Sequence, residues 1–165
     1  MHPAALDPDA LLAECREART RRSGPGGQHR NKTETAVVLT HLPTGLIAEA
    51  SERRSQPENR RMALRRLRLR LAIEHRLVPD LAGPSARWRS RCRDGQLTVN
   101  PAHEDYPPLV AEALDCLEEA RGDVPSAASV LGVTATQLVK LFKRQPAVWT
   151  AFTRLRHHHG LPPLK

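Results

Sequence analysis

Residues 22–28 read Arg-Ser-Gly-Pro-Gly-Gly-Gln, and His-Arg-Asn-Lys-Thr-Glu-Thr follows up to residue 35. Three glycines around one proline exclude a helix or a regular strand and predict an exposed loop, because these residues favour turn conformations. The loop does not match a Walker phosphate loop, since its first lysine, Lys32, is not next to a glycine. A Rossmann loop is excluded as well, because no parallel strand–loop–helix unit surrounds it. Taken alone, the glycines favour an ordinary turn over a functional site.

A hairpin is expected directly after this loop. Residues 36–41 (Ala-Val-Val-Leu-Thr-His) are largely β-branched or aliphatic, and residues 46–50 form a second short run of similar character. Between them, Leu-Pro-Thr-Gly predicts a turn, because Pro43 fixes φ and Gly45 tolerates a positive φ. The two runs are therefore predicted to be antiparallel strands.

Helices are expected on both sides of the loop and hairpin. A short helix, capped by Asp7 or Asp9, is predicted over residues 11–15. Ser55-Gln-Pro-Glu58 has the spacing of a capping box, in which the Ser hydroxyl and the Glu carboxylate satisfy free amides of the first turn. We expect a long helix from this point to about Leu77, packed on the sheet along one face.

Positive charge is concentrated in one part of the chain. Residues 1–100 carry 19 Lys or Arg against 11 Asp or Glu, whereas residues 101–165 carry seven of each. Residues 53–93 hold 13 basic side chains against three acids, and all 13 are arginine. Arginine pairs two phosphate oxygens at once, so this cluster favours a polyphosphate partner. The alternative is an ordinary solvated helix face.

The segment from residue 16 to residue 77 resembles the GGQ domain of class I peptide chain release factors. The resemblance rests on Gly26-Gly-Gln28 with its flanks, on Thr40-His-Leu-Pro-Thr-Gly45, on Arg54-Ser-Gln56 and on the arginine-rich helix. It differs from the usual pattern at Arg30, where the family has Val, and at Pro57-Glu58, where a basic pair is common. Neither difference affects the Gly-Gly-Gln triplet.

The resemblance implies a function and a set of site residues. In that family the triplet enters the peptidyl-transferase centre of the ribosome and hydrolyses the ester of peptidyl-tRNA. Gly26 and Gly27 let the backbone approach RNA closely, and the backbone N–H of Gln28 is implied to stabilise charge in the transition state. Packing or an RNA contact is a better interpretation of His29 than a role as general base. The basic residues expected to contact RNA are Arg22, Arg30, Lys32, Arg53, Arg54, Arg61, Arg65 and Arg68.

The C-terminal part is expected to be helical. Ala128, Leu131, Gly132, Leu138 and Leu141 have the spacing of a helix-turn-helix, with a plain helical bundle as the alternative. We therefore predict an α+β chain with three parts: a GGQ domain with a small antiparallel sheet and a long basic helix (residues 1–78), a basic linker (79–104) and an all-α, helix-turn-helix-like domain (105–165).

Several other classes of protein are not expected. Cys15, Cys92 and Cys116 are widely spaced, which argues against a disulfide framework or a zinc ribbon. The histidine triplet at residues 157–159 favours basic surface over a metal site, so neither a metal nor a cofactor is expected. No apolar run is long enough to span a membrane, and early acids argue against a signal peptide. A cytoplasmic monomer is expected.

The sequence thus predicts a ribosome-dependent peptidyl-tRNA hydrolase whose partners are large-subunit ribosomal RNA and the P-site peptidyl-tRNA. The 165 residues are expected to leave no room for a stop-codon-reading domain, so the chain is similar to short release-factor homologues that rescue stalled ribosomes. Two alternatives stay open. One is a non-catalytic ribosome- or RNA-binding adaptor with a GGQ fold, and the other is a DNA-binding regulator that uses the helix-turn-helix.

Overall fold

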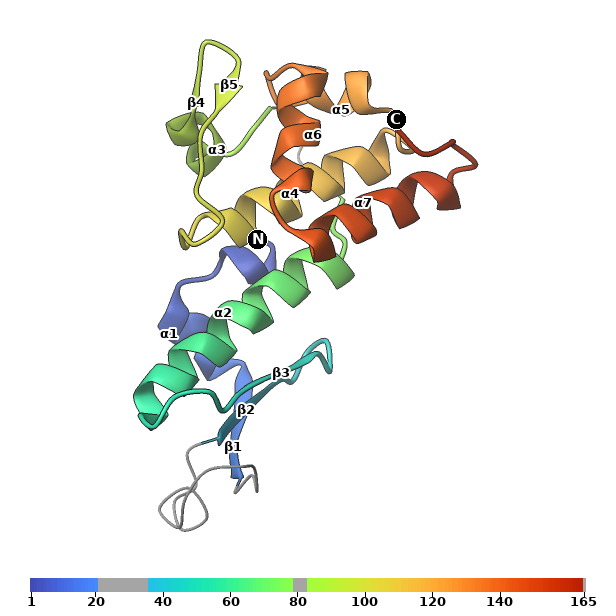
Figure 1. Ribbon diagram of the computed structural model, residues 1–165. Helices are drawn as coiled ribbons and strands as arrows, with labels where there is room; N and C mark the ends of the chain where they lie inside the picture. Colours follow the sequence, from blue (N-terminus) through green and yellow to red (C-terminus); the bar gives the residue numbers. More distant parts are fainter. Residues whose placement is uncertain (21–35, 79–82, 165) are drawn as a thin grey trace. The chain divides into compact units, whose positions relative to one another are not determined.

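A computed structural model describes residues 1–20, 36–78 and 83–164, which form an α+β fold (Figure 1). The chain divides into two compact units: unit 1 comprises Met1 and Pro3–Leu71, and unit 2 comprises His2 and Ala72–Lys165. Unit 1 contains a three-stranded sheet, whereas unit 2 is helical apart from a two-stranded hairpin. The predicted fold class, a small antiparallel sheet with a long basic helix and further helices after it, is therefore confirmed.

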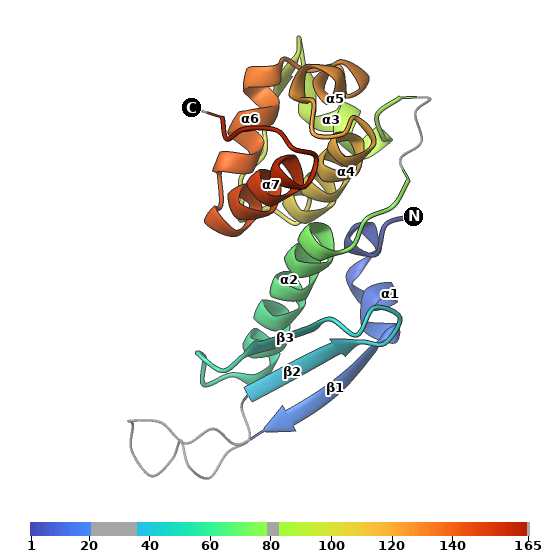
Figure 2. The ribbon, with the colours of Figure 1, turned by 90° about the vertical axis from the view of Figure 1, so that its right-hand side faces the viewer.

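The sheet of unit 1 has the order β1-β2-β3 and is antiparallel throughout (Figure 2). Its strands are β1 (Cys15–Thr20), β2 (Ala36–His41) and β3 (Ile47–Ala50). Val37 pairs with Ala50 and Leu39 with Ala48, and all four side chains are buried. The predicted turn closes as expected, because Gly45 has a φ of 70° and its N–H donates to the His41 carbonyl over 2.8 Å.

The sequence interpretation missed β1. Its residues, Cys-Arg-Glu-Ala-Arg-Thr, have little intrinsic strand preference, and pairing with β2 over six positions decides their conformation. The charged side chains suit an edge strand, where they discourage pairing with another chain. The short helix α1 (Pro8–Ala13) begins and ends earlier than predicted, and Asp7 occupies its N-cap position without a side-chain cap bond.

Helix α2 (Gln56–Glu74) begins as the capping box predicts, with the Glu58 N–H donating to Ser55 Oγ at 3.5 Å. Leu64, Leu67 and Leu71 lie on one face and are buried, as expected for a helix that packs on a sheet. The helix ends three residues before Leu77, because the N–H of Leu77 donates to Asp115 Oδ1 at 3.1 Å instead of continuing the helical pattern.

The segment expected to be a basic linker is folded over much of its length. It contains α3 (Ala86–Arg91) and a hairpin of β4 (Cys92–Arg93) and β5 (Gln96–Leu97). Asp94 and Gly95 form the hairpin turn with φ values of 49° and 72°, a pair of positive φ angles typical of tight two-residue turns. The indole of Trp88 is fully buried and donates to the Leu131 carbonyl at 2.8 Å. This aromatic anchor explains why the arginine-rich segment folds.

The remaining helices of unit 2 follow the predicted pattern closely. They are α4 (Tyr106–Glu119), α5 (Val124–Val130), α6 (Ala135–Lys143) and α7 (Pro146–His158). Unit 1 also contains a short 3-10 helix, η1 (Pro3–Ala5), before α1. Between α5 and α6, Gly132 has a φ of 65°, and Thr134 caps α6 by accepting from the Gln137 N–H at 3.2 Å. The expected helix-turn-helix-like pair is therefore present.

Candidate functional site

The Gly-Gly-Gln segment connects two neighbouring strands of unit 1. β1 ends at Thr20 and β2 begins at Ala36, and these two residues are direct partners in the antiparallel ladder. The chain therefore leaves the sheet at Thr20 and returns to it at the adjacent position of Ala36. The predicted site residues Arg22, Gly26, Gly27, Gln28, Arg30 and Lys32 all lie outside the described residues, so their roles stay predictions.

A buried histidine lies at the other end of the β1–β2 strand pair. The side chain of His41 is fully buried at the end of β2. Its Nε2 lies 2.9 Å from Glu14 Oε2 and its Nδ1 lies 2.8 Å from Thr44 Oγ1. Because a carboxylate only accepts, Nε2–H donates to Glu14, and in the neutral imidazole Nδ1 then accepts from the threonine hydroxyl. His41 thus joins the start of β1 to the β2–β3 turn.

A second buried polar residue orients the loop between β3 and α2. Asn59 is fully buried in the first turns of α2. Its amide nitrogen donates to the Arg53 carbonyl, and its amide oxygen accepts from the Arg53 N–H, both at 2.9 Å. This reciprocal pair fixes the backbone of Arg53, while the side chains of Arg53 and Arg54 remain exposed. No motif in the sequence interpretation singled out Asn59.

Three arginines of α2 hold the helix on the sheet. Arg66 donates to the Glu49 carbonyl at 2.7 Å, Arg70 donates to the Ile47 carbonyl at 2.5 Å, and Arg60 pairs with Glu17 at 2.7 Å. Arg66 also pairs with Glu52 at 2.6 Å and holds the pKa of that carboxyl below its usual value. Part of the arginine cluster therefore has a structural role, which net charge alone could not reveal.

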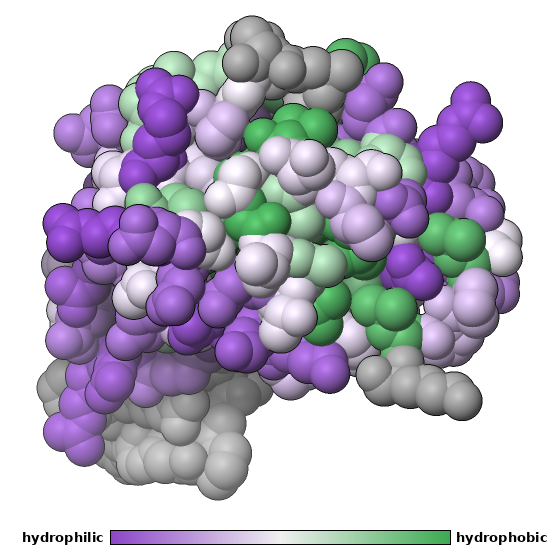
Figure 3. All heavy atoms as spheres, turned by 90° about the horizontal axis from the view of Figure 1, so that it is seen from above, coloured by the Kyte–Doolittle hydropathy of each residue, from purple (hydrophilic) through white to green (hydrophobic). Residues whose placement is uncertain are grey.

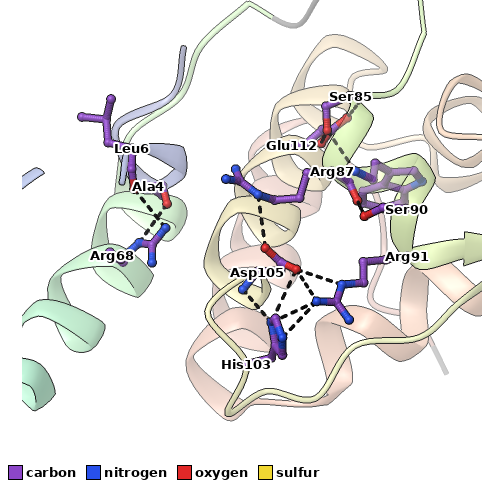
Figure 4. Close-up of polar contacts among 11 residues, drawn as sticks. Ala4, Leu6, Arg68, Ser85, Arg87, Ser90, Arg91, His103, Asp105 and Glu112 are labelled. Carbon is purple, nitrogen blue, oxygen red and sulfur yellow. Dashed lines mark hydrogen bonds and ion pairs between the residues drawn. The ribbon is translucent and has the colours of Figure 1, made fainter. Parts of the chain in front are cut away.

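Arg68 was expected to contact RNA, but the structure gives it an internal role (Figure 4). Only 7% of the surface of Arg68 is exposed to solvent. The guanidinium donates to the carbonyl of Ala4 at 3.2 Å and to that of Leu6 at 3.1 Å. These bonds hold the N-terminal segment against α2, so we leave Arg68 out of the proposed RNA-binding residues.

Arg61 and Arg65 are exposed, as their predicted role requires. They are four residues apart and therefore lie on the same side of α2. Together with Arg53 and Arg54, they form what we call the unit 1 basic face. Four exposed guanidinium groups on one small domain can neutralise phosphates along a nucleic-acid backbone.

Within residues 1–20, 36–78 and 83–164, no three His, Cys, Asp or Glu side chains lie close enough together to hold a metal ion. None of the helices in the same ranges combines the length and the apolar character that a membrane crossing needs.

Comparison with known proteins identifies the family. The family model described as the RF-1 domain matches residues 11–94, just over half of the chain. Peptide chain release factor 1 of Acidiphilium cryptum is 44% identical over 107 residues, which cover 64% of this chain and 30% of that protein. Peptide chain release factor 1 of Symbiobacterium thermophilum is 58% identical over 67 residues, or 41% of this chain and 18% of that protein.

A mouse protein, peptide chain release factor 1-like, mitochondrial, is 53% identical over 55 residues, or 33% of this chain and 15% of its own length. The matched part thus spans less than a third of each of these curated relatives. The match to the family model includes all three strands of unit 1, α2 and the segment between β1 and β2. The chain therefore belongs to the RF-1 domain family of class I peptide chain release factors.

Proposed function

We propose that this chain hydrolyses the ester bond between the nascent peptide and the P-site tRNA, on stalled cytoplasmic ribosomes and without reading a stop codon. Membership of the RF-1 domain family and relatives named peptide chain release factors support the proposal. The observation that carries it is the pairing of Thr20 with Ala36, which holds both ends of the Gly-Gly-Gln segment at one end of the sheet.

The proposed chemistry needs little from side chains of the protein. A water molecule attacks the ester carbonyl, and the tRNA ribose oxygen leaves with a proton. Gly26 and Gly27 let the backbone approach the reacting ester, since neither has a β-carbon. The backbone N–H of Gln28 donates to the oxyanion that develops on the carbonyl oxygen. The Gln28 side chain excludes nucleophiles other than water, and ribosomal and transfer RNA supply the rest of the site.

Basic residues are proposed to position the loop through the RNA backbone. Arg22, Arg30 and Lys32 flank the triplet in sequence. The unit 1 basic face adds four exposed arginines on α2 and the loop before it. Such contacts fix register and orientation without base specificity. In this proposal residues 1–78 carry the chemistry, and the later residues add affinity for the ribosome.

The proposal is tested by peptide release from ribosomes that hold a labelled peptidyl-tRNA. Messages that end in the P site, that present a sense codon in the A site or that present a stop codon are compared. We expect release on the truncated message, with no further gain from a stop codon. A Gly26→Ala/Gly27→Ala variant should bind ribosomes and release no peptide. If ribosomes bind the wild-type chain but it never releases more than this variant, the chain is a non-catalytic adaptor.

A further inference from the structure

Positive and negative charges are separated along unit 2. From Pro101 to Asp123 the sequence holds seven carboxylates and one arginine. From Val124 to Lys165 it holds no Asp or Glu and six Lys or Arg residues: Lys140, Lys143, Arg144, Arg154, Arg156 and Lys165. The balanced charge of residues 101–165 therefore conceals an acidic α4 and a basic α6–α7 segment.

Helix α6 presents a basic surface opposite its buried side. Leu138, Leu141 and Phe142 are buried and anchor the helix in unit 2. Helical spacing places the exposed residues Thr136, Lys140 and Lys143 on the other side, with exposed Arg144 at the C-cap. We call these four residues the α6 basic face.

The α6 basic face differs from three arginines of unit 2 that are paired with carboxylates. Arg76 pairs with Asp115 at 2.8 Å. Both Arg87 and Arg91 pair with Asp105, at 3.2 and 2.6 Å, as Figure 4 shows. Among the described residues, by contrast, no ion pair joins the α6 basic face to a carboxylate. Its charge is therefore available to an external anion.

An aromatic ring lies next to this charge. The Nζ of Lys143 is 5.1 Å from the centroid of the Trp149 ring. Trp149 is partly exposed and packs on Phe152, with ring centroids 4.9 Å apart. Lys143 therefore lies over the ring in a cation–π contact, which holds its ammonium group at the surface beside Trp149.

We propose that the α6 basic face binds the sugar–phosphate backbone of structured RNA. The nature of the nucleic acid rests on the proposed function, which places the chain on the ribosome. At about 1.5 Å per residue, α6 is roughly 13 Å long, enough to cross the wide and shallow minor groove of an RNA helix. The narrow major groove of RNA does not admit a helix, so recognition depends on backbone shape and charge.

The proposal is tested by fluorescence anisotropy of the full chain with a labelled RNA hairpin over a series of salt concentrations. We expect K140E/K143E to weaken binding at least about tenfold at ~0.1 M salt and to lower the slope of log K against log salt by about two. The charge-matched control, R121E/R154E, alters exposed arginines outside α6 and should change affinity less than about threefold. K140R/K143R keeps the charge and should bind like wild type.

Three outcomes would overturn the proposal: an equal effect of the two charge-reversal variants, tighter binding of a DNA duplex of the same sequence, and tighter binding of polyglutamate. Thermal unfolding of K140E/K143E should match that of wild type. Peptide release measured over a series of protein concentrations separates this proposal from the proposed function. K140E/K143E should need a higher protein concentration than wild type for half-maximal release. A wild-type chain that never releases peptide refutes the proposed enzyme, and the anisotropy measurement then still tests RNA binding by α6.

Discussion

Unit 1 and unit 2 are stabilised in different ways. Every aromatic residue of the sequence lies in unit 2, and four of the five are fully buried there: Trp88, Tyr106, Phe142 and Phe152. Unit 1 has an aliphatic core, and it buries His41, Asn59 and Arg68 with hydrogen bonds to neighbouring segments. On the face of the molecule in Figure 3, hydrophobic side chains lie in small groups among hydrophilic ones.

This difference indicates how each unit serves its role. Hydrogen bonds to buried polar groups are directional, so they fix the geometry of turns and strand ends in a small domain. Apolar burial is non-directional and supplies stability in proportion to the area removed from water. We therefore expect core substitutions in unit 2 to act mainly on stability. Substitutions on exposed parts of unit 1 should act mainly on ribosome binding and catalysis.

The largest expected loss of stability is for Trp88→Ala in unit 2. The change leaves a cavity and removes the donor to the Leu131 carbonyl, at a cost of about 3–5 kcal/mol in the free energy of unfolding. Urea denaturation followed by circular dichroism measures it. Trp149→Ala is the matched control, because that ring is only partly buried and should cost less. Equal losses for the two variants would refute the assignment of Trp88 as the anchor of the α3 segment.

A smaller loss is expected for Arg68→Met in unit 1. Methionine keeps the apolar stem but removes the donors to Ala4 and Leu6, at a cost of about 1–3 kcal/mol. Arg61→Met/Arg65→Met should change stability by less than about 0.5 kcal/mol, because both side chains are exposed.

For ribosome affinity, the Arg61/Arg65 variant should show the larger loss and Arg68→Met the smaller one. The Arg61/Arg65 variant should bind ribosomes more weakly, with a reduced dependence on salt, while Arg68→Met should bind like wild type. Co-sedimentation of the chain with ribosomes measures both. If Arg68→Met weakens binding while its stability is unchanged, the internal role of Arg68 is wrong.

A further effect concerns the pH dependence of the stability of unit 2. Burial raises the pKa of Asp115 from 3.8 to about 6, although Arg76 opposes the shift. The native state therefore binds this proton more readily than the unfolded chain, and the contribution of Asp115 to the free energy of unfolding should increase as the pH falls from about 7 to 4. The increase should be of the order of 1–3 kcal/mol.

Another group titrates in the same range with the opposite sign. Burial lowers the pKa of His2 to about 4, so its contribution to stability decreases as the pH falls through 6.5. The difference in the free energy of unfolding between wild type and Asp115→Asn isolates the contribution of the aspartate. Urea unfolding at pH 7 and pH 4.5 measures this difference. On acidification the free energy of unfolding should change more favourably for wild type than for Asp115→Asn. An equal change for the two proteins would contradict the raised pKa of Asp115.

Local signals in the sequence were sufficient for much of the fold. The β2–β3 hairpin, the start of α2 and the α5–α6 pair all carry turn or capping residues within a few positions, so their prediction needed no distant contact. Features that depend on distant partners were missed. β1 exists through its pairing with β2, and the folding of residues 86–97 depends on the contact between Trp88 and Leu131.

The sequence predicted the kind of site, but it could not predict which arginines are exposed for RNA and which have internal hydrogen bonds. A helical pattern places Arg61, Arg65 and Arg68 along one flank, and it cannot reveal that Ala4 and Leu6 present carbonyl groups to the last of them. The role of Asn59 was not predicted for a similar reason, since its hydrogen-bond partner is the backbone of Arg53 and not a side chain with a recognisable pattern.

The role of the Gln28 backbone is tested most directly by the rate constant of peptide release at saturating protein. Gln28→Ala keeps the backbone N–H, whereas Gln28→Pro removes it. We predict that the alanine variant stays within about tenfold of wild type, and that the proline variant loses roughly 10²–10³ in rate while it still binds ribosomes. Equal rate constants for the proline variant and wild type would contradict the assignment of this amide as the oxyanion donor.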